Sequence, residues 1–300
     1  MRNMELSSNV FWHQTDYNGL RGIIKDKGLF YSYSREDLRA YKGRKIGFPM
    51  ISLCDLPLSQ FDDYIDKYGG YCIGLSHEWG VENGFNPVWY NFMGTEGSLF
   101  QILQTQTKPT NEETYNLLST IKPYEGTLYR KDKVYENYRF YDEREIRRVP
   151  TYDQLIDNDL SPMLFGGEYD ELKAARKAQG KKPYLDELGK IDLKYSDIKF
   201  IIVKEEHQID KIYKDLENSF GLTTSSKEKS GIANTMHYVP ILTYKQIKED
   251  VIGCGHNKIA DLKMDTILGR NFEGRMEYWI NSLKEKKDMS NTEHEEVGRI

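Results

Sequence analysis

Residues 12–29, WHQTDYNGLRGIIKDKGL, decide how the fold begins. The opening residues predict a strand in which His13 and Thr15 lie on the same side, because side chains two apart along a strand share a face. Apolar residues at helical spacing predict a helix over 17–27, and Gly28 is expected to cap its end, since glycine adopts a left-handed backbone without strain. An imidazole and a hydroxyl at a strand end can bind sugar hydroxyls and a carboxamide. An ordinary strand–helix unit carries the same residue types.

Residues 48–64, FPMISLCDLPLSQFDDY, are the second informative stretch. The apolar run predicts a buried strand over 48–53, followed after a short turn by a helix over 58–67. Ser52 lies within this strand, and the helix that follows carries an aromatic ring. By itself the stretch is also typical of a plain core strand with a serine on one face.

Residues 141–147, YDEREIR, contain a Glu-x-Glu pair within a strand expected over 135–149. On an extended segment Glu143 and Glu145 point to the same side, because side chains alternate between the two faces. One carboxylate can then stabilise positive charge that develops on a sugar, and the other can accept a proton from an attacking group. The alternation of Glu and Arg is equally typical of a charged strand whose side chains pair across its surface.

The rest of the chain predicts an α+β fold, because many short strands alternate with helices. Apolar runs predict buried strands over 71–75 and 198–203. Glycines interrupt residues 151–193, which are expected to form a helical and loop insertion. A single domain is expected over 1–280, and the highly charged tail at 285–300 predicts disorder.

The composition restricts the classes of protein that this chain can belong to. Its 300 residues carry a formal net charge of -5 and three cysteines without CxxC or metal-ligand spacing, so no metal site is expected. Cys54 and Cys72 lie in apolar runs and are expected to be buried thiols, which fits a reducing cytoplasm. No apolar run approaches the roughly 20 residues of a membrane span, so a soluble cytoplasmic protein is expected. Two groups of basic residues can contact phosphate or form solvated faces: Lys173, Arg176, Lys177, Lys181 and Lys182, and Arg139, Arg144, Arg147 and Arg148.

The three stretches, in this order, resemble the motifs of ADP-ribosyltransferases. The H-x-[ST] run with I-[IL] and G-L after it resembles the first motif of the poly(ADP-ribose) polymerase-like branch, in which the histidine holds an NAD ribose hydroxyl. The strand at 48–53 resembles the second motif, but that branch carries a nicotinamide-stacking tyrosine there. Ser52 instead matches the serine of other branches, which leaves Tyr64 or Phe61 to supply the ring. The Glu-x-Glu pair resembles the catalytic turn of the family.

This resemblance implies an ADP-ribosyltransferase-like fold, a split mixed or antiparallel β-sheet with flanking helices and insertions, that uses NAD as a substrate. It implies three catalytic residues: Glu145 for the charge on the ribose, Glu143 for the acceptor, and His13 for a ribose hydroxyl. The further NAD-binding residues that it implies are Thr15, Ser52, Tyr64 and Arg147, the last either holding the diphosphate or pairing with a glutamate.

Longer runs are similar to the abortive-infection family AbiGi: PMISLCDLPLS at 49–59, YGGYCIGLSHEW at 68–79, and YDEREIR at 141–147. This similarity implies a setting in phage resistance. The sequence therefore predicts a toxin or effector of an anti-phage abortive-infection system, with a cognate antitoxin or another defence protein as partner. The toxin would transfer ADP-ribose from NAD to a macromolecular acceptor, either nucleic acid or protein. The alternative is a catalytically inactive sensor or antitoxin of transferase fold that binds a partner protein.

Overall fold

The computed structural model describes residues 8–38, 45–61, 67–92, 111–130, 133–221 and 238–252. Its contacts divide the chain into two units, Met1–Ile247 and Lys248–Ile300, and the second is described only as far as residue 252. Tyr64 and the predicted tail at 285–300 lie outside the described residues. The single domain expected over 1–280 stays a prediction.

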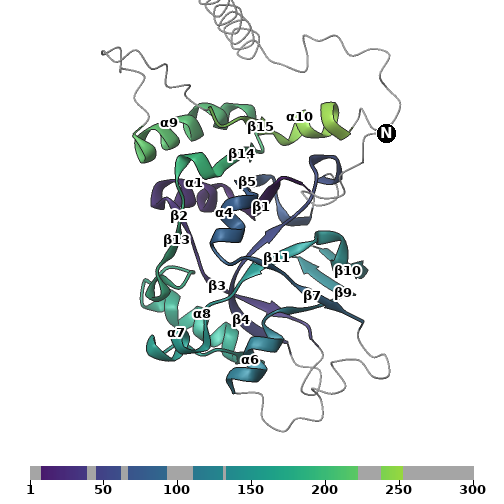
Figure 1. Cartoon of the computed structure of the whole chain (residues 1–300), viewed down its shortest axis with the longest axis vertical. Coiled ribbons are helices and arrows are strands. Elements are labelled where there is room, and N and C mark those ends of the chain that lie inside the picture. The colour runs from purple at the N-terminus through teal and green to yellow at the C-terminus, as the bar shows by residue number, and fades with distance from the viewer. Residues whose placement is uncertain are drawn as a thin grey trace, which may run out of the picture. The chain divides into compact units, whose positions relative to one another are not determined.

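A mixed β-sheet forms the centre of the first unit (Figure 1). Its strands run in the order β15-β14-β5-β1-β4-β11-β6, and β3 and β12 pair with β4 in addition. The pairing of β14 with β15 is parallel, whereas the other pairings are antiparallel. The strands of this sheet are β1 (Val10–Thr15), β3 (Ser32–Glu36), β4 (Ile46–Cys54), β5 (Tyr71–Ser76), β6 (Asn86–Pro87), β11 (Glu145–Arg148), β12 (Leu164–Phe165), β14 (Ile198–Val203) and β15 (Ile241–Thr243).

Three small two-stranded sheets accompany the central one. The strands β9 (Glu125–Arg130) and β10 (Lys133–Arg139) form an antiparallel ribbon. A second antiparallel pair joins β2 (Gly28–Phe30) to β13 (Lys190–Asp192), and a parallel pair joins β7 (Trp89–Asn91) to β8 (Ile121–Pro123).

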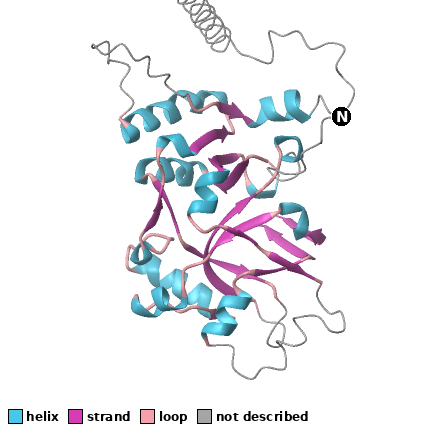
Figure 2. Ribbon diagram, viewed as in Figure 1, coloured by secondary structure: helices cyan, strands magenta, loops and turns pink. Residues whose placement is uncertain are grey.

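Helices connect and flank these strands, as Figure 2 shows. None of the described helices is long and apolar enough to cross a membrane. The α-helices are α1 (Tyr17–Asp26), α4 (His77–Glu82), α6 (Glu112–Leu118), α7 (Tyr152–Asp157), α8 (Glu168–Ala178), α9 (Ile209–Phe220) and α10 (Tyr244–Gln246). Shorter turns of helix are η1 (Leu58–Gln60), η2 (Phe140–Glu143), η3 (Asp186–Leu188), η4 (Tyr195–Asp197), η5 (Glu206–Gln208) and the π-helical η6 (Ile247–Ile252).

The first helix forms where it was expected but ends differently. Its start is capped by Asp16, whose carboxylate accepts a hydrogen bond from the Gly19 amide at 2.7 Å. The left-handed residue at its end is Lys27, with φ of 50°, so the expectation that Gly28 caps the helix is wrong. Gly28 instead lies in β2, where an added Cβ would come within 2.7 Å of the Ile191 carbonyl oxygen. The glycine therefore permits close pairing of β2 with β13.

The strand β4 divides the hydrophobic core between its two faces. Ile51 and Leu53 join a large cluster that includes apolar side chains of α1, β5, β14 and α9. Ile46, Phe48 and Met50, on the alternate positions, join a second cluster with apolar side chains of α6 and α7. Because both faces of β4 are covered, the strand is apolar at nearly every position rather than at every second one. The predicted buried strand over 48–53 is confirmed.

The structure confirms an α+β fold with a mixed sheet, and also buries Cys54 and Cys72, neither of which is in a disulfide. The prediction of one strand over 135–149 is wrong in its middle, because η2 and a left-handed Arg144, with φ of 44°, separate β10 from β11. The run at 86–92 forms two strands that belong to different sheets, β6 and β7. Of the helix expected over 58–67, the structure describes η1 and helical residues at 61 and 67–68.

Candidate functional site

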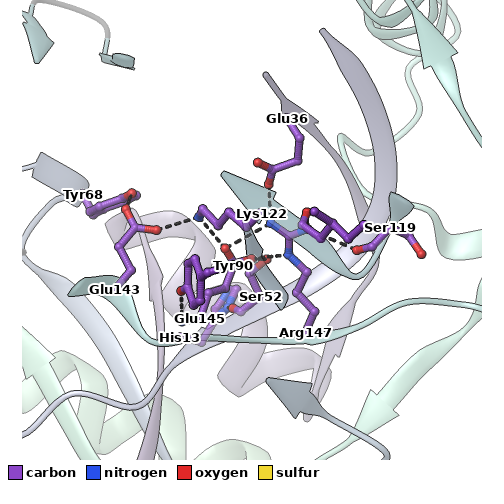
Figure 3. Close-up of polar contacts among 11 residues, drawn as sticks. His13, Glu36, Ser52, Tyr68, Tyr90, Ser119, Lys122, Glu143, Glu145 and Arg147 are labelled. Atoms are coloured by element: carbon purple, nitrogen blue, oxygen red, sulfur yellow. Dashed lines mark hydrogen bonds and ion pairs between the residues drawn. The ribbon is translucent and has the colours of Figure 1, made fainter. Parts of the chain in front are cut away.

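Three neighbouring strands bring together one side chain from each sequence motif (Figure 3). β4 lies between β1 and β11, and its Cys54 is in register with Trp12 on one side and Glu145 on the other. The Nδ1 of His13 lies 3.0 Å from the Ser52 carbonyl oxygen. The Ser52 hydroxyl donates to Glu145 Oε1 at 2.8 Å. Residues from the start and middle of the chain therefore converge through one serine.

The two carboxylates of the Glu-x-Glu pair also converge, but not by the expected geometry. Glu143 ends η2, Arg144 makes the left-handed turn, and Glu145 begins β11. The turn, rather than alternation along an extended strand, directs both carboxylates to the ammonium group of Lys122. That group donates to Glu143 Oε2 at 2.6 Å and also to Glu145 Oε2. Both glutamates are buried.

Glu145 is saturated by hydrogen-bond donors. Its Oε1 accepts from the Ser52 hydroxyl at 2.8 Å and from Arg147 Nε at 2.5 Å. Its Oε2 accepts from Arg147 Nη2 at 3.1 Å and from Lys122. An ionised carboxylate offers about four acceptor positions, so none is left over. Burial alone would raise the pKa of Glu145, but the charges of Arg147 and Lys122 outweigh it and hold that pKa well below its usual range.

Arg147 is equally committed and lies inside the protein. Besides Glu145, its guanidinium donates to Glu36 and to the carbonyl oxygens of Ser119 and Ile121, at 3.1 and 3.4 Å. It therefore pairs with glutamates, which is one of the two roles expected for it. With 3% of its surface exposed, Arg147 cannot take part in a basic surface patch, and that part of the expectation is wrong.

Some of the other basic residues in these two groups also have hydrogen-bond or ion-pair partners. Arg148 donates to the Tyr31 hydroxyl at 2.6 Å. Arg176 is buried and is held by Glu187 and Asp186, at 2.8 and 3.1 Å. A phosphate-binding role for either group is therefore restricted to its exposed members.

Five charged side chains make up what we call the carboxylate–cation cluster: Glu36, Lys122, Glu143, Glu145 and Arg147. Three carboxylates face two cations, which would leave one negative charge if every group were ionised. Burial, followed by the carboxylates of Glu145 and Glu36, raises the pKa of Glu143 well above its usual value, even though Lys122 bonds one of its oxygens. Glu143 therefore takes up a proton more readily than an exposed glutamate, and this proton would lessen the excess of negative charge in the buried cluster.

Several members of this site carried no recognisable signal in the sequence. Glu36 ends β3, Lys122 lies in β8, and Tyr90 in β7 accepts a hydrogen bond from the Glu145 amide at 2.8 Å. Tyr68 donates from its hydroxyl to Glu143. The one available hint was a lysine between the apolar residues of β8, since a lysine in a buried strand needs a charged partner.

His13 is half-buried and presents one nitrogen that its neighbours do not use. A carbonyl oxygen can only accept, so Nδ1 carries the proton and donates to Ser52. Burial lowers the pKa of His13, and the bond to Ser52 opposes this only in part, so the ring is neutral near pH 7. Within the described part of the chain, Nε2 has no hydrogen-bond partner.

The other predicted site residues either lie apart from the cluster or fall outside the residues that the structure describes. The Thr15 hydroxyl lies against Gly19 at the first turn of α1 and makes no bond to the cluster. Phe61 is fully buried and packs edge-on against Trp12 at 4.9 Å, so it cannot stack on a ligand. Tyr64 lies outside the described residues. Among the residues that are described, no group of three or more His, Cys, Asp or Glu side chains is arranged to hold a metal ion.

Comparison with known proteins connects this chain to phage resistance. Residues 29–204 match the family model described as "Putative abortive phage resistance protein AbiGi, antitoxin". The chain is 27% identical over 229 residues to the abortive phage resistance protein AbiGi of Lactococcus lactis subsp. cremoris, a match that covers 67% of this chain and 88% of that protein. No solved structure matches the chain significantly.

Proposed function

Because the chain belongs to the AbiGi family of abortive phage-resistance proteins, we propose that it acts as an antitoxin, which binds and restrains a partner protein of its phage-resistance system. The word antitoxin in the description of the family supports this role. The observation that carries the proposal is the saturation of Glu145, whose two oxygens accept four hydrogen bonds.

A saturated carboxylate is poorly suited to catalysis of ribosyl transfer. That reaction develops positive charge on the ribose, and an enzyme stabilises it with an uncompensated carboxylate or an aligned dipole. Here two cations already neutralise Glu145 and a third group, Ser52, occupies a further lone pair. The cluster instead joins β3, β8, η2 and β11, and Ser52 connects it to β4, which suits a structural role beneath a binding surface.

An exposed aromatic surface next to the cluster supports binding of a protein partner. Phe92 and Tyr141 are 50% and 49% exposed, and both rings pack against Tyr124, with ring centres 4.3 and 5.2 Å apart. Tyr90, whose hydroxyl accepts a hydrogen bond from the Glu145 amide, packs edge-on against Tyr141. Aromatic residues are enriched in protein interfaces and supply much of their binding energy.

Growth assays test this proposal. Expression of the chain alone is expected to leave cell growth unchanged, and co-expression is expected to restore growth in cells that carry the toxin of the same system. Tyr141→Ala is expected to lose this rescue, whereas Ile156→Ala, which removes an equally exposed side chain from α7, retains it. Growth arrest by the chain alone would rule out the antitoxin role.

A second candidate is ADP-ribosyl transfer from NAD, which the chain of contacts from His13 through Ser52 to Glu145 favours. In this function His13 Nε2 binds a ribose hydroxyl and Glu145 stabilises the ribose while nicotinamide leaves with the bonding electron pair. Glu143 accepts the proton of the attacking acceptor, which is a protein or a nucleic acid. Lys122 must first leave the carboxylates, because its charge opposes that of the reacting ribose.

Labelled NAD distinguishes the two candidates. The protein is incubated with NAD and cell extract, and the label is then followed after separate digestion with protease, DNase and RNase. Transfer that is lost in Glu145→Gln and retained in Glu187→Gln, a matched change in a distant ion pair, would favour the transferase. Absence of transfer in the parent protein would favour the antitoxin.

A further inference from the structure

The short helix η2 connects the carboxylate–cation cluster to the exposed aromatic surface. At its end Glu143 accepts a hydrogen bond from Lys122 at 2.6 Å, inside the cluster. Two residues earlier Tyr141 lies on the surface, and its ring packs against those of Tyr124 and Tyr90, with ring centres 5.2 Å from each. Because only one residue separates Glu143 from Tyr141, a displacement of the carboxylate also displaces the exposed ring.

The side chain that anchors η2 in the protein is a titratable one. Of the four residues of η2 only Glu143 is buried, so no apolar side chain takes this part. The backbone adds two hydrogen bonds of 3.2 Å, from the Tyr141 amide to the Tyr124 carbonyl oxygen and from the Arg144 amide to the Tyr141 carbonyl oxygen. The position of η2 therefore depends on how well the cluster accommodates the Glu143 carboxyl group.

The groups around Glu143 disfavour its ionised form. The charged and titratable groups that face it are Lys67 and Tyr68 of the turn at 67–68, Lys122 of β8, Glu145 and Arg147 of β11, and Glu36 of β3. Burial raises the pKa of Glu143 most, followed by the carboxylates of Glu145 and Glu36. The charges of Arg147 and Lys67 lower it, but they do not outweigh the other causes.

The geometry also provides a place for the proton. Lys122 faces Oε2 of Glu143 and can only donate, so a proton on that oxygen would find no acceptor there. Tyr68 faces Oε1, and its hydroxyl group can accept as well as donate. A protonated Glu143 therefore carries its hydrogen on Oε1, and the hydrogen bond with Tyr68 reverses its direction.

We propose that Glu143 is a proton switch of the aromatic surface: η2 stays docked while the carboxyl group is protonated, and opens when it ionises. Ionisation favours the state that leaves the carboxylate in water, whereas the docked state buries it beside two others. Lys122 opposes the opening, but it stays paired with Glu145 when Glu143 leaves. Opening separates Tyr141 from its neighbours, so the hold on a partner weakens as pH rises. This last consequence rests on the proposed antitoxin function.

Hydrogen exchange of the full chain, followed residue by residue from about pH 5 to about pH 8, tests the switch without a partner. The reporters are the Tyr141 and Arg144 amides, whose hydrogen bonds break when η2 opens. Above the ordinary pKa of 4.5 and below the raised pKa of the docked state, opening releases one proton from Glu143. Protection, corrected for the intrinsic exchange rate, should therefore fall about tenfold per pH unit and then level off. Both amides should exchange faster than that of Ile73, in the central strand β5, because η2 opens without global unfolding.

Two glutamine variants complete the test. Glu143→Gln keeps the shape of the protonated carboxyl group and cannot ionise, so its η2 amides are expected to keep their protection at every pH. Glu187→Gln, a matched change in a distant ion pair, should retain the pH dependence of the parent. Circular dichroism verifies that both variants are folded.

Three results would overturn the switch: η2 protection in the parent that does not change with pH, a pH dependence that persists in Glu143→Gln, or η2 amides that exchange as slowly as Ile73. The growth assay separates this claim from the antitoxin function. A chain that shows the pH-dependent exchange but does not rescue growth contradicts the antitoxin function alone. A chain that rescues growth but exchanges independently of pH contradicts the switch alone.

Discussion

Replacing Lys122 with methionine tests whether the carboxylate–cation cluster stabilises the fold. The ammonium group bonds Glu143 and Glu145, and none of the three side chains is more than 9% exposed. Removal of one partner from a buried ion pair costs about 3–5 kcal/mol, because the remaining charge is left in an interior of low dielectric constant. Methionine keeps most of the length and the apolar character of the lysine stem, so the change removes mainly its charge.

The expected loss can be measured by chemical and thermal unfolding. In a domain of this size, 1 kcal/mol corresponds to roughly 2–4 °C in Tm, so the variant is expected to melt roughly 6–20 °C below the parent. The loss should be smaller at acidic pH, because a proton on Glu143 relieves its repulsion with Glu145. For the same reason the double variant Lys122→Met/Glu143→Gln is expected to recover part of the stability.

A matched lysine provides the control. Lys181 pairs with Glu187 at 3.0 Å, but its side chain is 46% exposed. Exposed ion pairs contribute about 0–1 kcal/mol, so Lys181→Met is expected to change the free energy of unfolding by less than about 1 kcal/mol. If Lys122→Met costs no more than this control, the cluster does not stabilise the fold as argued.

Three further changes test other parts of the structure by denaturant unfolding. Gly74→Ala is expected to cost about 1–3 kcal/mol through overpacking, because its Cβ would come within 2.7 Å of a β1 side chain, whereas Gly22→Ala meets nothing within 4 Å and should be neutral or stabilising. Tyr90→Phe is expected to cost about 1 kcal/mol, since it removes the acceptor for the Glu145 amide, and an unchanged midpoint would contradict that contact. The pKa of Glu143 is raised in the folded state, so above its ordinary pKa of 4.5 the folded state binds more protons than the unfolded state. The parent should therefore lose stability relative to Glu143→Gln as pH rises through this window, and parallel pH profiles would refute the raised pKa.

The sequence identified those members of the site that lie inside short motifs. His13, Ser52, Glu145 and Arg147 were all singled out from local patterns, and the structure brings them into one chain of contacts. Lys122 was not found, because its neighbours in β8 form no pattern that specifies a partner. Its role depends on two carboxylates more than twenty residues along the chain.

The interpretation of Glu143 shows the limit of reasoning from periodicity. Alternation along a strand predicted that its carboxylate would lie beside that of Glu145, and the two do meet at Lys122. They meet because Arg144 adopts a left-handed backbone, which periodicity does not reveal. A correct proximity was thus predicted from an incorrect local geometry.

The sequence by itself determined the type of the longer buried strands and of the first helix, because apolar periodicity depends on residues a few positions apart. The apolar run of β4 and the spacing within α1 were sufficient for this. Only the tertiary structure decided which charges pair and whether Glu145 is free or saturated. Ionic pairing and desolvation act between segments that are distant in the chain and adjacent in space, so no local pattern records them.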